Sequence, residues 1–517
     1  MYIGIDVGGT NTDAVLMDGL NVLAATKTPT TEDVTSGIAA ALDSLRQQRQ
    51  FDAAQVDGVM VGTTHFVNAL VEARRLSSVA VLRFGLPATR GLPPLVGWPQ
   101  RLREAISGQY HLLHGGHEFD GRLISKLDRE ELAAAVEQAV ETGAQAFAVS
   151  SVYSPVNDEF EQTAADYIAE HHPDIPVSLS HQIGRIGLLE RENATVINAA
   201  LSRLAVEICE GLLSTLRTSG ISAPLFVSQN DGTLMDVDYT RRYPVNTFAS
   251  GPTNSMRGAA FLSELKECMV IDIGGSTSDI GVLQHGFPRE ASVEVEVQGV
   301  RTNFRMPDVS SIGLGGGSHV DVDETGAVIV GPRSVGYRLL QEAKVFGGPT
   351  VTATDLIVAA GTHQIGDSSL VADLDPDLVK AGLARIQELL TDCVDRMRTS
   401  PEPVDLVAVG GGSVLMPPAL DGVRKVHMPE HFAVANAIGA AIAQVGGETD
   451  RIFSVPPGGR EAVLDQARTE AVEQAIAAGA DPDSVQIVEV DEVPLAYLPG
   501  NATRVRVKAV GDLKLGG

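Results

Sequence analysis

Residues 5–13 read Ile-Asp-Val-Gly-Gly-Thr-Asn-Thr-Asp, and residues 271–279 read Ile-Asp-Ile-Gly-Gly-Ser-Thr-Ser-Asp. The two stretches share their isoleucine, both aspartates and both glycines, although they lie in different halves of the chain. Each stretch follows an apolar run and leads into another, so the pattern predicts two β-hairpins with the same turn. We interpret the repeat as the mark of a duplication; the alternative is one turn type that occurs twice in a single large sheet.

The residue types of these turns suit a polyphosphate ligand. Glycines carry no Cβ, so an anion can approach the main-chain N–H groups, and neutral side chains can add further donors. Asp6 and Asp272 end their strands and face one cleft if a pseudo-twofold axis relates the halves, which predicts a Mg²⁺ site completed by water and phosphate oxygens. The candidate nucleotide-binding residues of the two turns are Gly8, Gly9, Thr10, Asn11, Thr12, Asp13, Gly274, Gly275, Ser276, Thr277 and Asp279.

A third glycine-rich turn follows the apolar run 407–409 and comprises Gly410, Gly411, Gly412 and Ser413. Bare backbone at the end of a strand lets a flat nucleoside lie against it; the alternative is a strand-to-helix turn without a ligand. The turn differs from a Rossmann fingerprint because no GxGxxG opens a helix, and from a Walker A loop because no GK[ST] follows.

Strand and helix patterns alternate along the chain, which predicts an α/β fold. We expect three units: an N-terminal half at 1–187, a second half at 188–449 that begins with a long linking helix at about 188–219, and a small α+β extension at 450–517. An Ala- and Gly-rich helix is expected at 432–444.

Composition excludes several classes of partner. The 517 residues include 39 Lys and Arg against 66 Asp and Glu, a net charge of −27, which disfavours nucleic acids and anionic membrane surfaces. No apolar run is long enough for a transmembrane helix. The three cysteines stand far apart without a CxxC pair, so we expect a cytoplasmic protein.

The two hairpins and the third turn, in this order, resemble the superfamily of acetate and sugar kinases, Hsc70-type chaperones and actin. Further blocks over about residues 1–445 are similar to the hydantoinase A / 5-oxoprolinase family. These blocks are 62–72, 189–199, 231–235, 250–252, 312–318 and 331–336.

The resemblance implies duplicated actin-like (ribonuclease H-like) domains around a nucleotide cleft, with ATP and Mg²⁺ as cofactors. It further implies an ATP-dependent cyclic amide hydrolase that phosphorylates the carbonyl oxygen of a hydantoin, oxoproline or lactam-like ring. A hydantoinase B-type β subunit is a possible partner, in a homo- or hetero-oligomer. Two alternatives within the superfamily are a small-molecule kinase and a nucleotide-gated activator ATPase.

The residues that could contact a substrate lie in sequence patterns that are less distinctive than the glycine-rich turns. His65, a candidate catalytic residue, and Asn68 follow a strand in a Gly-Thr-Thr turn; the alternative is a hydrogen-bonded histidine with an asparagine that caps a helix. Glu190, Asn193 and Asn198 fall on one helix, whose face could equally be solvated or lie in an interface. His111, His114 and His117 suggest zinc, but two intervening glycines break the helical spacing.

Overall fold

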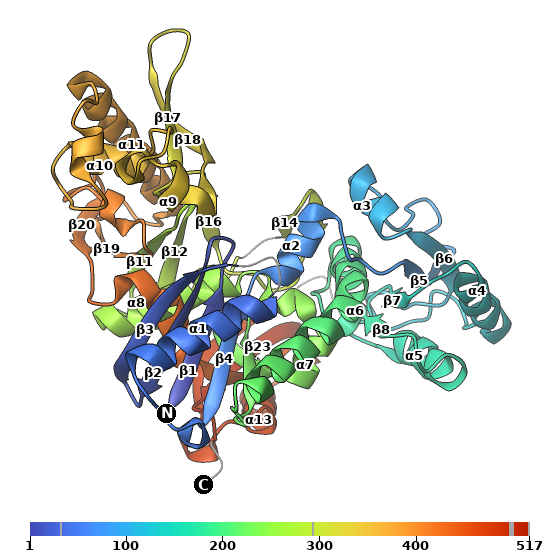
Figure 1. Cartoon of the computed structure of the whole chain (residues 1–517). Coiled ribbons are helices and arrows are strands. Elements are labelled where there is room, and N and C mark those ends of the chain that lie inside the picture. The colour runs from blue at the N-terminus through green and yellow to red at the C-terminus, as the bar shows by residue number, and fades with distance from the viewer. Residues whose placement is uncertain (31–33, 292–293, 496–500, 515–517) are drawn as a thin grey trace.

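The computed structural model describes residues 1–30, 34–291, 294–495 and 501–514. They form three larger β-sheets and two two-stranded sheets, with helices packed against them (Figure 1). Within these ranges, no helix combines the length and the apolar character needed to cross a lipid bilayer.

The first sheet has nine strands in the order β22-β23-β21-β10-β9-β4-β1-β2-β3. It contains strands from the beginning, the middle and the end of the chain, shown in blue, green and red in Figure 1. In chain order the strands are β1 (Tyr2–Val7), β2 (Asn11–Asp18), β3 (Asn21–Pro29), β4 (Gly58–Thr63), β9 (Leu225–Ser228), β10 (Thr233–Asp236), β21 (Gln444–Ser454), β22 (Gln486–Pro494) and β23 (Ala502–Gly511).

The second sheet repeats the central part of the first. Its order is β13-β12-β11-β19-β20, which matches β3-β2-β1-β4-β9, and in both sheets an antiparallel hairpin is followed by two parallel strands. The predicted duplicated α/β fold is therefore confirmed. The strands are β11 (Cys268–Ile273), β12 (Ser278–Gln284), β13 (Phe287–Pro288), β19 (Val404–Val409) and β20 (Val423–His427), with β16 (Val309–Ile312) also paired to β12.

A third, fully parallel sheet lies between β4 and β9 in the sequence. Its order is β6-β5-β7-β8, and its strands are β5 (Val79–Leu86), β6 (Gln109–His114), β7 (Ala146–Ser151) and β8 (Val177–Leu179). The sheet is anchored to the long helix α6 (Leu188–Thr218) by a buried ion pair, in which Arg83 Nε donates to Glu192 Oε2 at 2.6 Å.

Two helices cross where the duplicated sheets meet. Helix α8 (Ser250–Ser263) packs on the second sheet and α12 (Ala435–Ala441) on the first. Their backbones touch at glycines: a Cβ on Gly258 would lie 1.9 Å from the Ala435 oxygen, and one on Gly439 1.8 Å from the Asn254 oxygen. Side chains at these two positions would force the sheets apart.

The remaining elements complete the layers around the sheets. They are α1 (Val34–Gln48), α2 (His65–Glu72), α3 (Gln100–Ala105), α4 (Arg129–Glu141), α5 (Glu159–His171), α7 (Val237–Arg242), β14 (Val295–Val297), β15 (Val300–Thr302), β17 (Ser318–Val322), β18 (Val328–Ser334), α9 (Leu339–Glu342), α10 (Ala353–Ala359), α11 (Pro376–Met397) and α13 (Arg460–Ala477).

The structure differs from the expected organisation at the C-terminal end. The helix expected at 432–444 is shorter, because α12 ends at Ala441 and β21 begins at Gln444. The expected boundary between residues 449 and 450 falls inside β21, and the α+β extension adds its strands to the first sheet. Strands β9 and β10, expected in the second half, also pair into the first sheet.

Candidate nucleotide site

The two predicted hairpins have the same internal geometry. Asp6 pairs across the strands with Asp13, and Asp272 pairs with Asp279. Each turn is closed by a backbone hydrogen bond, from Gly8 N to Asn11 O at 3.0 Å and from Gly274 N to Thr277 O at 2.9 Å. The other predicted residues of the two turns are Gly9, Thr10, Asn11, Thr12, Gly275, Ser276 and Thr277.

The hairpins converge on one place. A Cβ on Gly275 would lie 3.4 Å from Thr10 Cγ2, so the tips of the turns are in contact. Consecutive residues of α8 hold the two strand-end carboxylates: Asn254 Nδ2 donates to Asp6 Oδ1 at 3.0 Å, and Ser255 Oγ donates to Asp272 Oδ2. One turn of α8 thus contacts both Asp6 and Asp272, and the charge of Asp272 acts on the pKa of Asp6.

Burial makes these carboxyl groups weaker acids than exposed aspartates. Burial, together with the nearby charges of Asp13 and Asp272, raises the pKa of Asp6 to about 6. Burial and the charge of Asp272 likewise raise the pKa of Asp279 to about 6. The pKa values of Asp13 and Asp272 are also raised by burial, with Lys27 acting in the opposite direction on both.

The carbonyl groups of both turns are engaged by neighbouring segments. In the first turn, Thr30 donates from its N–H to Thr10 O at 3.0 Å and from its hydroxyl to Gly8 O at 2.8 Å. In the second, Gly316 N donates to Gly274 O at 3.1 Å and Gly317 N to Gly275 O at 2.8 Å. With their carbonyl dipoles occupied, the turns favour an anion on the N–H side.

The third glycine-rich turn lies directly against the second hairpin. Gly410 has φ +86°, and a Cβ there would lie 2.1 Å from Asp272 Oδ1. Gly412 N donates to Ile273 O at 2.7 Å, and a Cβ on Gly412 would lie 2.5 Å from Gly274 O. Ser413 is buried and donates to Val409 O, while Gly411 is exposed. Gly410 and Gly412 thus have to be glycines, because a Cβ at either position would collide with the second hairpin.

The donor set fits a hydrated Mg²⁺ ion bound with phosphate. Four carboxylates, on Asp6, Asp13, Asp272 and Asp279, lie on the paired hairpin strands, and the charge of Asp272 raises the pKa of both Asp6 and Asp279. A divalent cation would relieve this repulsion. Over the described ranges, no three His, Cys, Asp or Glu side chains form a group that could hold a metal, so phosphate and water would have to complete the shell.

His65 lies next to the first hairpin. It begins α2 just after β4, whose last residue Thr63 pairs with Val7 of β1. Its Nδ1 lies 2.8 Å from Thr63 Oγ1. Asn68 is exposed one turn further along α2, with Nδ2 3.4 Å from Thr64 Oγ1. His65 therefore follows the strand that pairs with the first hairpin, Asn68 lies one helical turn away, and contact of either residue with a substrate stays a prediction.

The three candidates on α6 have partners within the protein. Asn193 Nδ2 donates to Arg301 O at 2.9 Å, and Asn198 Nδ2 donates to Arg242 O at 2.7 Å. Glu190 lies 3.7 Å from the Arg301 guanidinium. These contacts join α6 to other segments, and the structure does not bring the three side chains to the hairpins.

The histidine series does not converge either. His114 Nδ1 lies 3.1 Å from Glu131, whereas His117 Nε2 lies 3.2 Å from Asn157 Nδ2.

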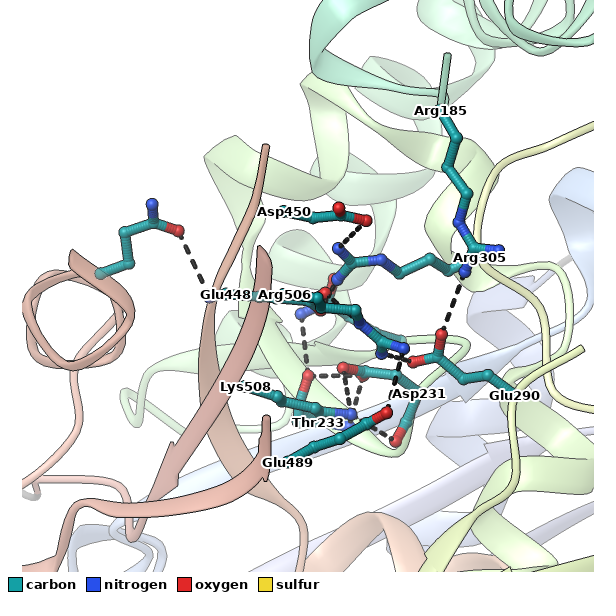
Figure 2. A network of polar contacts seen from close by, with 12 residues as sticks. Arg185, Asp231, Thr233, Glu290, Arg305, Glu448, Asp450, Glu489, Arg506 and Lys508 are labelled. Carbon is teal, nitrogen blue, oxygen red and sulfur yellow. Dashed lines mark hydrogen bonds and ion pairs between the residues drawn. The ribbon is translucent and has the colours of Figure 1, made fainter. Parts of the chain in front are cut away.

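A cavity of about 1160 Å³ opens along the first sheet, at the turn between β9 and β10. Beside it, charged side chains from distant segments form a continuous network (Figure 2). Lys508 Nζ lies 2.7 Å from Asp231 Oδ2, and Arg506 joins Glu290 to Glu448. The network thus ties the C-terminal strands to the β9–β10 turn and to the segment that follows β13. The other charged residues labelled in Figure 2 are Arg185, Arg305, Asp450 and Glu489, and Arg504 pairs with Asp450.

Several site residues escaped prediction because no local pattern marks them. Asn254, Ser255 and Asn436 reach the aspartates from helices far away in sequence, and Asn436 Nδ2 donates to both Asp6 Oδ2 (3.0 Å) and Asp13 Oδ2 (2.8 Å). The signal that was available is the pair of glycines in α8 and α12, which is typical of a close helix crossing.

Comparison with known proteins agrees with this architecture. Residues 2–172 match the hydantoinase/oxoprolinase N-terminal region, and residues 191–371 match the hydantoinase/oxoprolinase family itself. Caprolactamase subunit alpha of Pseudomonas jessenii is 28% identical over 482 residues, which are 85% of this chain and 65% of that protein. Acetophenone carboxylase gamma subunit of Aromatoleum aromaticum is 28% identical over 396 residues, 69% of this chain and 53% of that protein. The chain thus spans less than two thirds of the length of these relatives.

Solved structures share the fold. The crystal structure of the ATP-dependent caprolactamase from Pseudomonas jessenii superimposes with a TM-score of 0.80 at 21% identity, covering 99% of this chain and 88% of that one. Nucleotide-free acetone carboxylase gives a TM-score of 0.69 at 18% identity, covering 100% and 88%. The solved structures show the shared fold, whereas the matches of residues 2–172 and 191–371 place the chain in the hydantoinase/oxoprolinase family.

Proposed function

We propose that this protein is an ATP-dependent enzyme that phosphorylates the carbonyl oxygen of a cyclic amide or imide and so promotes opening of the ring. The observation that carries the proposal is the convergence of two equivalent hairpins, whose aspartates are held by consecutive residues of α8. Family membership and the similarity to a caprolactamase subunit support the choice of a cyclic amide.

Amides react slowly with water because their carbonyl carbon is a poor electrophile. Phosphorylation of the carbonyl oxygen makes that carbon more reactive. The carbonyl oxygen bonds to the γ-phosphorus while the bond from that phosphorus to the ADP oxygen breaks. Water then adds to the carbon, and the C–N bond breaks as the nitrogen gains a proton. A second water releases phosphate from the resulting acyl phosphate. One ATP, one ring and two waters thus give ADP, phosphate and the open-chain product.

The chain's part in the transfer is mainly to position the reactants and to balance charge. The N–H sides of the two turns would bind the phosphates, and the turn 410–413 would accommodate the adenosine. Asp6 and Asp272 would hold Mg²⁺, which neutralises phosphate charge when bound. Asn254, Ser255 and Asn436 keep the carboxylates in place.

Strand order suggests where the ring binds. Along the first sheet β4 lies between β1, which carries the first hairpin, and β9, beside which the cavity opens. His65 follows β4, the strand between the two, and is not among the residues that line the cavity. We propose the cavity as the substrate site and His65 as a contact of the substrate carbonyl.

ADP release from purified protein tests the proposal against its alternatives. A lactam or hydantoin should stimulate ADP release and be opened, either by the protein alone or after addition of a β-type partner subunit. ADP release without any change in the ring would favour a nucleotide-gated activator ATPase. A stable phosphorylated alcohol would show a small-molecule kinase.

Asp272→Asn should abolish Mg²⁺-dependent ATP turnover while the fold persists, because the amide keeps the volume of the side chain but removes a charged metal-facing oxygen. Asp373→Asn is the control, since this exposed carboxylate pairs with Lys344 and not with a hairpin residue. ATPase activity of Asp272→Asn near that of the control would remove the second hairpin from the mechanism.

The cellular setting is also part of the proposal. Relatives named as subunits support a hetero-oligomer with a β-type partner. The three cysteines are buried and free, which supports a reducing compartment such as the cytoplasm.

A further inference from the structure

The duplicated hairpins differ at one equivalent position. In the first half, Asp13 on β2 lies directly opposite Lys27 on β3. In the second half, the equivalent Asp279 on β12 lies opposite Ser311 on β16, whose hydroxyl donates to Asp279 Oδ1. The duplication thus places a cation beside one hairpin and a neutral hydroxyl beside the other.

Lys27 is directed toward the junction of the three glycine turns. Its Nζ lies 2.7 Å from Asp13 Oδ1 and 2.8 Å from Oδ2, and its Cε lies 4.0 Å from the place where a Cβ on Gly411 would stand. Its charge acts on Asp272 of the opposite hairpin as well as on Asp13. The lysine side chain is 34% exposed and that of Asp13 is 4% exposed, so the ammonium forms the open side of the pair.

We infer that Lys27 binds the phosphate chain of the nucleotide, an inference that rests on the proposed function. An ammonium group has three donors, and its contact with Asp13 leaves capacity for a phosphate oxygen. A chain of net charge −27 with four aspartates around this site needs such a cation if it is to hold a polyphosphate. Its nearness to Gly411 places the contact between the first hairpin and the turn proposed for adenosine.

A structural role for Lys27 must be separated from a phosphate contact. Lys27→Met alone leaves the buried Asp13 without its counter-ion, which would by itself disturb the hairpin. We therefore compare Asp13→Asn with Asp13→Asn/Lys27→Met, in which no buried carboxylate is left unpaired. The measurement is the equilibrium affinity for ATP with Mg²⁺, by titration calorimetry, with circular dichroism as the check of folding.

If Lys27 binds phosphate, the double variant should bind ATP roughly 10- to 100-fold more weakly than Asp13→Asn, as expected for loss of one charge-assisted hydrogen bond. In the otherwise unchanged chain, Lys27→Arg should retain most of the affinity. Lys344→Met is the matched control, because this lysine pairs with Asp373 at 2.8 Å and is 27% exposed. It should leave the affinity unchanged.

The possible failures differ in what they overturn. Equal ATP affinity of Asp13→Asn and the double variant would show that Lys27 acts only by holding Asp13, and the inference would fall while the nucleotide site stands. Absence of ATP binding by the unmodified protein would instead overturn the proposed function.

Discussion

Asp279 is a single residue whose charged form is unfavourable in the folded chain. Burial and Asp272 raise its pKa to about 6, against about 3.9 in an unfolded chain. The folded state therefore keeps its proton over a range where the unfolded state has lost it. As a result, this group lowers the free energy of unfolding as the pH rises from about 4 to 6, and the loss persists above pH 6.

Asp279→Asn should therefore stabilise the nucleotide-free protein at pH 7.5, by on the order of 1–3 kcal/mol. It should weaken the protection that Mg²⁺ and ATP give against unfolding, because a site carboxylate is lost. Urea denaturation at pH 7.5 and pH 5 measures both effects, with exposed Asp373→Asn as the control. A variant less stable than the parent at pH 7.5 would contradict the expectation.

His65 offers a test that separates substrate from nucleotide. Because His65 follows β4, between the hairpin strand β1 and β9 beside the cavity, His65→Gln should leave the affinity for ATP within about twofold. It should lower amide-stimulated ADP release by roughly 10- to 100-fold, the range of a lost polar contact at a reacting group. Steady-state assays with and without the cyclic amide give the comparison. Equal loss in both assays would place His65 at the nucleotide instead.

At the scale of elements, the crossing of α8 and α12 fixes the distance between the two sheets. Gly439→Ala would place a Cβ 1.8 Å from the Asn254 oxygen, and backbone cannot move aside as a flexible side chain can. We expect a loss of about 1–3 kcal/mol in the free energy of unfolding, as for an overpacked core. ATP affinity should also fall, because Asn254 would no longer hold Asp6 correctly.

The control is Gly211→Ala in the middle of α6, where the added methyl meets the Thr35 side chain at 3.1 Å. Alanine favours a helix over glycine by about 1 kcal/mol, so this variant should be neutral or slightly more stable. Thermal unfolding compares the two. Similar melting temperatures for Gly439→Ala and Gly211→Ala would mean that the crossing tolerates a wider separation.

Local sequence patterns predicted most helices and strands, but they did not predict which tertiary contacts the side chains make. The repeated Asp-x-Gly-Gly turns identified both hairpins, and the helix expected at 188–219 is found at Leu188–Thr218. The same reasoning extended α12 too far, because the apolar, small-residue pattern continues past Ala441 into β21. Asn193 and Asn198 looked available for a ligand, yet tertiary contacts that the sequence does not reveal occupy their amides.

At the scale of the whole molecule, the charged network in Figure 2 holds distant parts of the chain together. Although burial acts to raise it, the charge and hydrogen bond of Lys508 hold the pKa of Asp231 below its usual range. Asp231→Asn would leave Lys508, which is only 5% exposed, without its counter-ion. We expect a loss of about 3–5 kcal/mol in the free energy of unfolding.

Asp231→Asn/Lys508→Met should recover much of that loss, because neither charge is then left buried alone. The stabilisation by the pair should be complete above about pH 4 and disappear as the pH falls below it, since the depressed pKa belongs to the folded state. Urea denaturation of the parent and of both variants from about pH 2 to pH 8 is the measurement. Equal stability of the single and double variants would show that the two charges are not coupled.

The nine-stranded sheet draws β1 from the first residues of the chain and β21, β22 and β23 from the last described ones. During translation, one edge of β4 has no partner strand until β9 is synthesised, beginning at residue 225. One edge of β10 likewise has no partner until β21 is synthesised, beginning at residue 444. The nascent chain therefore carries an open edge on β4 until β9 is made and on β10 until β21 is made, a condition that favours pairing between chains. Fragments cut at the apparent midpoint would inherit the same open edges, and efficient production should depend on chaperones that shield them until the last strands emerge.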